Sequence, residues 1–417
     1  MMSVIEKCLV AVVVVTAFTS ATIGEMTVAE RSFGTPEMTL VKETEMKGRK
    51  VLRYEHESVP EWGYALPQKD YFYLLPLAGK PENKPLHVVL HSAGHSGDKV
   101  LQDAFKHPDW FHYVGLEEHS VLYLDCRKNK NDWWWGAHEI KRGKGKFDTS
   151  YCPTEKRVLT IIEWAITTCK ADRNRIYLSG ISMGGSGSLG IGMCRGDIFA
   201  AVNVAVPAGV NHIKARMFNK HVPDPPVLVN FSAPNDGWCR GQEELVRAFR
   251  QNKYPLIYAW GPYGHKSSVA QYHPAALTFP WRSIRRNAAY PVFSSCSTDK
   301  KFPAYKNALG GDPVGQIGAL LRWTNISDQE DKFEIDLHLV KKAELKTAVE
   351  IPAKSQTDVS LRRLQRFKTE PGKAYSWRFS RKEKTLQSGK AAADAAGLLT
   401  IAKLSLSDEP ARLTISR

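Results

Sequence analysis

The sequence predicts an α/β fold: a doubly wound, mostly parallel sheet with helices on both faces, followed by a small all-β domain. Short apolar runs alternate with helical stretches between residues 86 and 260, and a period-two alternation replaces that pattern after about residue 316. Prolines and glycines separate the two regions. Alternating strands and helices are typical of parallel sheets, whereas a series of short strands is typical of sandwiches.

The first 21 residues have the pattern of a secretory signal. A short start with one lysine, Lys7, offset by Glu6, precedes an almost wholly apolar stretch from Cys8 to Phe18, and the small residues Thr19, Ser20 and Ala21 follow. This stretch is shorter than the roughly 20 apolar residues of a membrane-spanning helix, and no later segment reaches that length. We therefore expect a secreted or periplasmic protein, with an uncleaved membrane anchor as the alternative.

A single large catalytic domain is predicted over residues 22–300. Extended pieces at 50–54 and 70–75, broken by prolines, predict an antiparallel start of the sheet. Apolar residues at helical spacing predict a crossover helix from Thr154 to Cys169, with Thr154 as its N-cap. The predicted buried parallel strands are Leu86–Leu90, Ser120–Leu124, Arg175–Ser179, Ala200–Val206, Pro226–Phe231 and Pro255–Trp260.

Residues 301–315, which are rich in Pro and Gly, are predicted to be a linker. Residues 316–417 are predicted to form a small β-sandwich that resembles a fibronectin-III-like module in strand patterning only. Its clearest strand places Phe333, Ile335, Leu337 and Leu339 on one face. Similar runs occur near 317–323, 374–379, 398–404 and 412–416.

The number of cysteines and the net charge give further information on the compartment and the partners of the protein. Removal of the signal leaves six cysteines, an even number that suits disulfides in an oxidising compartment, although buried free thiols are the alternative. The net charge of +15 is spread along the chain, and no zinc-finger, RNA-recognition or basic-zipper pattern accompanies it. We therefore expect no specific nucleic-acid partner. The cysteines are Cys126, Cys152, Cys169, Cys194, Cys239 and Cys296.

The strongest local signal is a serine between glycines directly after an apolar strand, in the segment Gly180-Ile181-Ser182-Met183-Gly184. G-x-S-x-G between a strand and a helix is the pattern of a nucleophile elbow. The strained turn needs small neighbours, because the adjacent strands approach its backbone closely. Ser182 is therefore the candidate nucleophile.

A serine hydroxyl needs a base within hydrogen-bonding reach and an acid that orients this base. Asp236 and His265 each follow a predicted strand, 54 and then 29 residues further along the chain. The carboxyl ends of parallel strands meet at the same edge of a sheet. We therefore predict Asp236 as the orienting acid and His265 as the base, although either residue alone is compatible with an ordinary loop.

The oxyanion of such a site needs two hydrogen-bond donors. One is predicted to be the backbone N–H of Met183. The other is predicted to come from the loop after the strand Leu86–Leu90, with Ala93 as the first candidate and Ser92 as the second. His91 and His95 have an H-x-x-x-H spacing, but no neighbouring Glu accompanies them, so no metal site is predicted.

Aromatic residues cluster around the candidate site: Trp133, Trp134, Trp135, Trp238 and Tyr263. Such rings bind sugar rings and aromatic esters well, so we predict that they contact substrate. The alternative is that the tryptophans pack beneath long loops.

The segment from Asp172 to Gly185 resembles the polyhydroxybutyrate-depolymerase and feruloyl-esterase branch of the α/β hydrolases. This resemblance covers residues 85 to about 273. It implies cofactor-free hydrolysis of carboxylic esters, often on plant polysaccharides or polyesters. Enzymes of this kind usually have His-Gly in the oxyanion loop, so Ser92 departs from the pattern.

Two other functions remain open at this point. A secreted serine peptidase of the prolyl-oligopeptidase kind has the same triad order, although the chain has no N-terminal region long enough for a propeller. A glycan-binding protein on a catalytically dead hydrolase scaffold is the second alternative. Neither the acyl and alcohol parts of the substrate nor the oligomeric state follows from the sequence.

Overall fold

The computed structural model describes most of the chain from Phe33 onward, and this part packs as one unit. The predicted signal lies outside the described residues. Among the helices that are described, none is long and apolar enough to cross a membrane. The described residues are 33–79, 82–108, 110, 112–115, 117–126, 134, 151–207, 224–234, 236–238, 241–262, 264–265, 273–303, 314–345 and 350–417.

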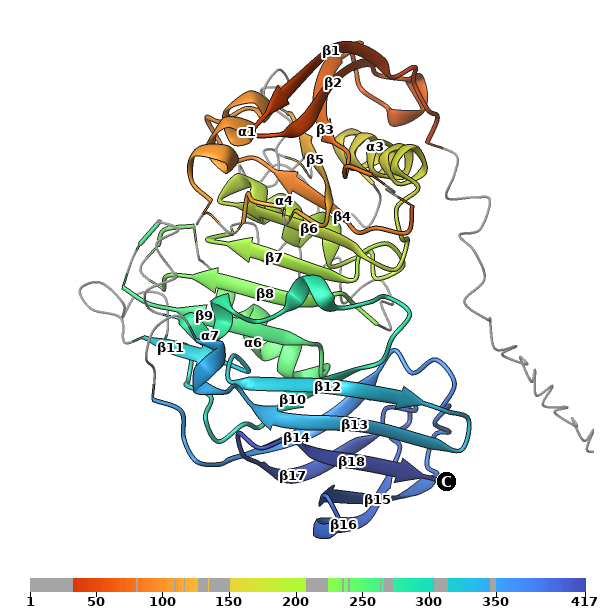
Figure 1. The fold of residues 1–417 in the computed structure, drawn as a ribbon, viewed down its shortest axis with the longest axis vertical. Helices are drawn as coiled ribbons and strands as arrows, with labels where there is room; N and C mark the ends of the chain where they lie inside the picture. The colour runs from red at the N-terminus through yellow and green to blue at the C-terminus, as the bar shows by residue number, and fades with distance from the viewer. Residues whose placement is uncertain are drawn as a thin grey trace, which may run out of the picture. The chain divides into compact units, whose positions relative to one another are not determined.

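A ten-stranded mixed sheet is the largest sheet of the described residues (Figure 1). The neighbouring strands β5, β4, β6, β7, β8 and β9 run parallel, whereas β1, β2, β3 and β11 run antiparallel to their neighbours. All six predicted parallel strands are confirmed to within two residues of their ends. In spatial order the strands are β1 (Thr39–Met46), β2 (Arg49–Glu57), β3 (Lys69–Leu75), β5 (Ser120–Leu124), β4 (Leu86–Leu90), β6 (Ile176–Ile181), β7 (Ala201–Ala205), β8 (Val227–Ser232), β9 (Leu256–Trp260) and β11 (Gly315–Ile317).

The strand order reverses at β4, because β5 lies on one side of it and β6 on the other. The loops that follow β4 and β6 therefore leave the sheet in different directions at the carboxyl ends of the strands. Open α/β sheets place their functional groups at such a reversal of strand order.

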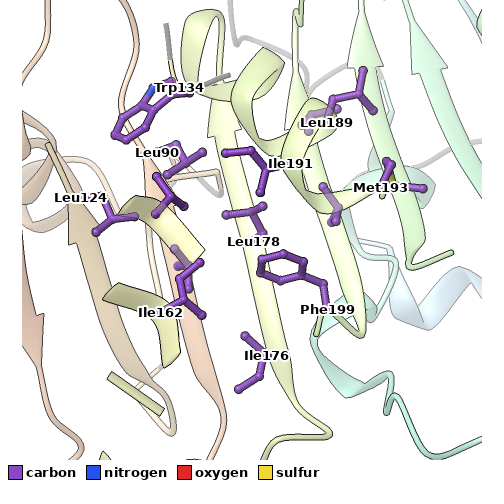
Figure 2. Close-up of a cluster of buried hydrophobic side chains, with 14 of the residues drawn as sticks. Leu90, Leu124, Trp134, Ile162, Ile176, Leu178, Leu189, Ile191, Met193 and Phe199 are labelled. Atoms are coloured by element: carbon purple, nitrogen blue, oxygen red, sulfur yellow. The ribbon is translucent and has the colours of Figure 1, made fainter. Parts of the chain in front are cut away.

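Helices cover both faces of the sheet. On one face, α1 contributes Val100 and Leu101 to a core that includes Tyr71, Val89 and Val121. On the other face, α3, α4 and α6 pack on the alternate residues of the same strands. Figure 2 shows part of this second core, with side chains from β4, β6 and the end of α4 pointing toward one another. The helices are α1 (Gly97–Lys106), α3 (Pro153–Cys169), α4 (Met183–Gly192), α6 (Gln242–Gln251) and α7 (Pro274–Leu277), with 3-10 turns η2 (Pro60–Trp62), η3 (Trp281–Ser283) and η5 (Lys342–Glu344).

The predicted start of the crossover helix needs a correction. The N-cap of α3 is Cys152, not Thr154, and Pro153 occupies the first helical position. The backbone N–H of Cys152 donates to Glu155 Oε2 at 3.0 Å. Proline is favoured at this position because the first helical N–H has no partner inside the helix.

Two smaller sheets follow the large one in Figure 1. Apolar side chains from both sheets form one core, in which Phe333, Ile335, Leu337 and Leu339 are buried, as predicted. The first sheet contains β10 (Tyr290–Ser294), β14 (Ser355–Arg362) and β17 (Thr400–Leu406). The second contains β12 (Leu321–Asp328), β13 (Lys332–Leu339), β18 (Ala411–Ser416), β15 (Ala374–Arg381) and β16 (Lys384–Ala392).

Strand pairing runs across the predicted boundary at residues 301–315. Strand β10, which precedes the boundary, pairs with β14, and β11, at its end, pairs with β9 of the large sheet. Arg363 adds hydrogen bonds from its guanidinium to the carbonyl oxygens of Gly196 and Asp224. The chain before the boundary thus contributes a strand to a small sheet, the chain at its end contributes a strand to the large sheet, and the Arg363 side chain, directly after β14, bonds to loops of the large sheet.

Two cysteines, Cys169 and Cys296, are buried free thiols. The Cys296 thiol lies 3.0 Å from Thr357 Oγ1, and burial raises its pKa. For these two residues the structure therefore has the buried thiols that the sequence left as an alternative to disulfides.

Candidate active site

Ser182 lies between the end of β6 and the start of α4. Its φ of 56° and ψ of −120° are unusual for a residue with a side chain, and such a conformation costs on the order of 1–3 kcal/mol. Its backbone N–H donates to Ala205 O at 2.9 Å, which fixes the turn against β7. The strained turn directs the serine hydroxyl out of the sheet.

The glycines beside Ser182 leave room for this turn. A Cβ on Gly184 would lie 2.0 Å from Leu90 O, and a Cβ on Gly180 would lie 2.4 Å from the backbone of Gly184. Both contacts are too short for any side chain, so the elbow rests directly on the end of β4. This close approach is the physical reason for the glycine spacing seen in the sequence.

Ser182, His265 and Asp236 come together in a chain of two hydrogen bonds. Ser182 Oγ lies 2.8 Å from His265 Nε2, and His265 Nδ1 lies 2.6 Å from Asp236 Oδ2. A carboxylate accepts at Nδ1, which places the imidazole proton there and leaves Nε2 to accept the serine proton. The arrangement can transfer a proton from the hydroxyl to the imidazole.

Asp236 is buried and is held in place at both of its oxygens. Oδ2 faces His265, and Oδ1 accepts the backbone N–H of Trp238 at 3.0 Å. Its own N–H donates to Ala233 O at 2.9 Å in the turn after β8. The side chain of His265 is 36% exposed, whereas that of Asp236 is 2% exposed. The base is thus open to solvent and the orienting acid is not.

One predicted donor, Met183, belongs to the elbow itself, and the other comes from the loop after β4, which contacts the elbow. Met183 is the first residue of α4, so its N–H has no acceptor within the helix and lies at the positive end of the helix dipole. In the loop after β4, Ala93 is exposed and Ser92 is buried. The Ser92 N–H donates to the Tyr113 hydroxyl at 3.2 Å. This bond leaves Ala93 as the better placed of the two candidates.

Both ring nitrogens of His91 form hydrogen bonds that hold the loop after β4 in place. Its Nδ1 donates to Ser92 O at 2.8 Å, and its Nε2 accepts the N–H of Cys126 at 3.0 Å. Burial lowers the pKa of His91, so the ring is neutral with both nitrogens in use. Among the described residues, no three His, Cys, Asp or Glu side chains gather as metal ligands.

Trp134 corrects the aromatic prediction. The ring is fully buried, its Nε1–H donates to His91 O at 3.0 Å, and it packs on Gly187 of α4. Figure 2 shows it within the apolar cluster, next to Leu90. A buried ring does not contact substrate, so Trp134 supports the loop instead.

The other predicted aromatic residues divide into two groups. Trp238 is partly exposed, and the centre of its ring lies 6.1 Å from that of His265. Trp133, Trp135 and Tyr263 lie outside the described residues.

Sequence reasoning missed Tyr113. It is fully buried in the segment between α1 and β5, and its hydroxyl contacts both the N–H and the Oγ of Ser92. No motif surrounds it in the sequence, so only the folded structure reveals its place beside the site.

The elbow serine, followed in chain order by the acid and the base at two later strand ends, is the arrangement that defines α/β hydrolases. No protein-family model and no curated protein matches the sequence. Solved structures that are similar to the chain include an S-formylglutathione hydrolase from Agrobacterium tumefaciens, with 14% identity, a TM-score of 0.39 and coverage of 55% of this chain and 93% of that one.

A ferulic acid esterase from Anaeromyces mucronatus has 13% identity and a TM-score of 0.38, with coverage of 60% of this chain and 97% of that one. A thermostable esterase has 19% identity and a TM-score of 0.37, with coverage of 56% and 69%. These similarities are distant, and the chemistry proposed below depends on the site geometry.

Proposed function

We propose that the protein is a serine hydrolase that cleaves carboxylic esters through an acyl-enzyme on Ser182. The observation that carries this proposal is the continuous chain of hydrogen bonds from Ser182 Oγ through His265 to the buried Asp236, at 2.8 and 2.6 Å. The strained backbone at Ser182 and the N–H of Met183 at the start of α4 support the proposal, and we propose the Ala93 N–H as the second oxyanion donor.

In the acylation step, Ser182 Oγ attacks the ester carbonyl carbon while His265 Nε2 takes the serine proton. The π electrons of the carbonyl move to its oxygen, and the N–H groups of Met183 and Ala93 stabilise the resulting negative charge. Asp236 keeps its hydrogen bond to His265 Nδ1 and stabilises the imidazolium. The bond to the alcohol then breaks, and His265 donates its proton to the leaving oxygen.

Deacylation repeats these steps with water as the nucleophile. His265 takes a proton from water as the water oxygen attacks the acyl carbon, and a second oxyanion forms in the same position. Its collapse breaks the bond to Ser182 Oγ, which recovers its proton from His265. The products are a carboxylic acid and an alcohol, and no cofactor takes part.

The substrate class and location extend the proposal. The resemblance of residues 172–185 to esterases favours an ester carried by a polysaccharide or a polyester. The partial exposure of His265 and Trp238 supports access by a bulky chain. We propose export on the pattern of residues 1–21, and we propose that the two small sheets form a β-sandwich because they share one core.

The test is fluorophosphonate labelling of the wild type and of Ser182→Ala, with release of p-nitrophenol from acetate, butyrate and feruloyl esters. We expect labelling and turnover in the wild type and neither in the variant. Faster turnover of a matched amide panel than of the esters would identify a peptidase. A folded wild type without labelling would refute the triad and favour a glycan-binding scaffold.

A further inference from the structure

The oxyanion loop is connected to the nucleophile elbow through Ser92 and the buried Tyr113. Tyr113 Oη lies 3.2 Å from Ser92 N and 2.5 Å from Ser92 Oγ. Ser92 Oγ in turn lies 3.2 Å from the carbonyl oxygen of Ile181, the residue directly before Ser182. A single side chain on one loop thus contacts both a buried tyrosine and the strand that ends in the nucleophile.

One arrangement of protons satisfies all three contacts. The carbonyl of Ile181 can only accept, so the Ser92 hydroxyl must donate to it. The Tyr113 hydroxyl must therefore donate to Ser92 Oγ, while its own oxygen accepts the Ser92 N–H. Burial raises the pKa of Tyr113, which keeps this hydroxyl protonated. The network is complete without water or ligand.

This network decides which N–H of the loop can bind an oxyanion. Because the Ser92 N–H already has an acceptor, it is not available to substrate. The next N–H, that of Ala93, belongs to an exposed residue at the tip of the turn. The bond from Ser92 to Ile181 then fixes the distance between this turn and Ser182.

We infer that Tyr113 and Ser92 act as one positioning unit, which holds the Ala93 N–H at the oxyanion position and so sets the rate of acyl transfer. The inference rests on the proposed function. Neither side chain touches the reacting atoms, so both are positioning residues rather than catalytic ones.

The direct test is Tyr113→Phe, which removes the hydroxyl and keeps the ring. Loss of an oxyanion donor typically lowers kcat about 100- to 1000-fold, so a displaced donor should lower it by about 10- to 100-fold. KM should change little, because the donor acts mainly in the transition state. Ser92→Ala removes the link to Ile181 and should lower kcat by a similar factor. This variant also tests the inference if Tyr113→Phe does not fold.

Two readouts separate positioning from general loss of structure. A trifluoromethyl ketone accepts Ser182 Oγ at its carbonyl carbon and forms the same oxyanion, so its Ki should rise by the factor by which kcat/KM falls. The double variant Tyr113→Phe/Ser92→Ala should lose no more than the larger single effect, because the two residues act as a unit.

The matched control is Tyr177→Phe. Tyr177 is fully buried near the start of β6, and its hydroxyl donates to Ile284 O at 2.8 Å, far along the strand from Ser182. This variant should show a comparable fall in melting temperature with unchanged kcat and unchanged Ki.

Wild-type kcat and Ki in Tyr113→Phe, together with an inactive Ser182→Ala, would overturn the positioning unit and leave the proposed function intact. Equal losses of kcat in Tyr113→Phe and Tyr177→Phe would also overturn it. A wild type without Ser182-dependent turnover or labelling would overturn the proposed function itself, and the inference with it.

Discussion

Replacement of Gly184 by alanine tests whether the elbow depends on contact with β4. The new Cβ would lie 2.0 Å from Leu90 O and 2.7 Å from His91 O, whereas real Cβ contacts almost never fall below 3.0 Å. Both neighbours are backbone atoms, so they cannot rotate away. The elbow must therefore move from β4 by about 1 Å, and misplacement on this scale typically lowers the rate about 100-fold.

Overpacking of this kind also costs about 1–3 kcal/mol in the free energy of unfolding. Three quantities are measured: kcat for p-nitrophenyl acetate, the rate of fluorophosphonate labelling and the melting temperature. Gly192→Ala, at the other end of α4, is the control, because its Cβ would meet methyl groups of Val202 and Leu178 rather than backbone. It should lower stability but keep kcat. Wild-type kcat in Gly184→Ala would refute the reasoning.

Three further predictions follow from the structure. Asp236→Asn should lower kcat about 10,000-fold, because the amide favours the wrong imidazole tautomer; a loss below tenfold in ester hydrolysis would contradict the role of this acid. Burial lowers the pKa of His112 and of His119 to about 3, so both are neutral in the fold and take up protons on unfolding below about pH 6.5. Stability should therefore fall as pH drops from 7 to 5, by up to about 1.4 kcal/mol per pH unit for each histidine, and equal urea midpoints at the two pH values would rule this out. Arg363→Met removes the guanidinium bonds to Gly196 and Asp224 and should lower the free energy of unfolding by about 1.5–3 kcal/mol with kcat unchanged, as calorimetry beside a kinetic assay would measure.

The sequence predicted those strands whose burial requires a local pattern of apolar residues. The six parallel strands are buried on both faces, so each reads as a short apolar run. Strand β1 (TLVKETEM) is almost wholly exposed and therefore has no apolar face to detect, and the same holds for β16 (KTLQSGKAA). These two strands are held by pairing with their neighbours, which no local pattern records.

The candidate site also contains residues that the sequence predicted and residues whose role it could not predict. Ser182, Asp236 and His265 could be selected because each follows an apolar strand, and the chain order of a hydrolase links them. The fate of Trp134 could not be predicted, because its burial depends on the space that Gly187 leaves on a different element. Three adjacent tryptophans look alike in sequence, and only the tertiary fold shows that Trp134 is buried.

Ser92 stands where the sequence resemblance predicts a glycine, and the structure gives this difference a physical meaning. Glycine at this position would have no hydroxyl for Ile181 or Tyr113, and the loop would lose its bonds to the elbow and to the buried ring. Tyr113, in turn, would have its hydroxyl buried with only a backbone N–H beside it. The two residues thus satisfy each other's polar groups, as buried networks must. Because they lie 21 residues apart without a shared motif, the pair is visible only in the folded chain.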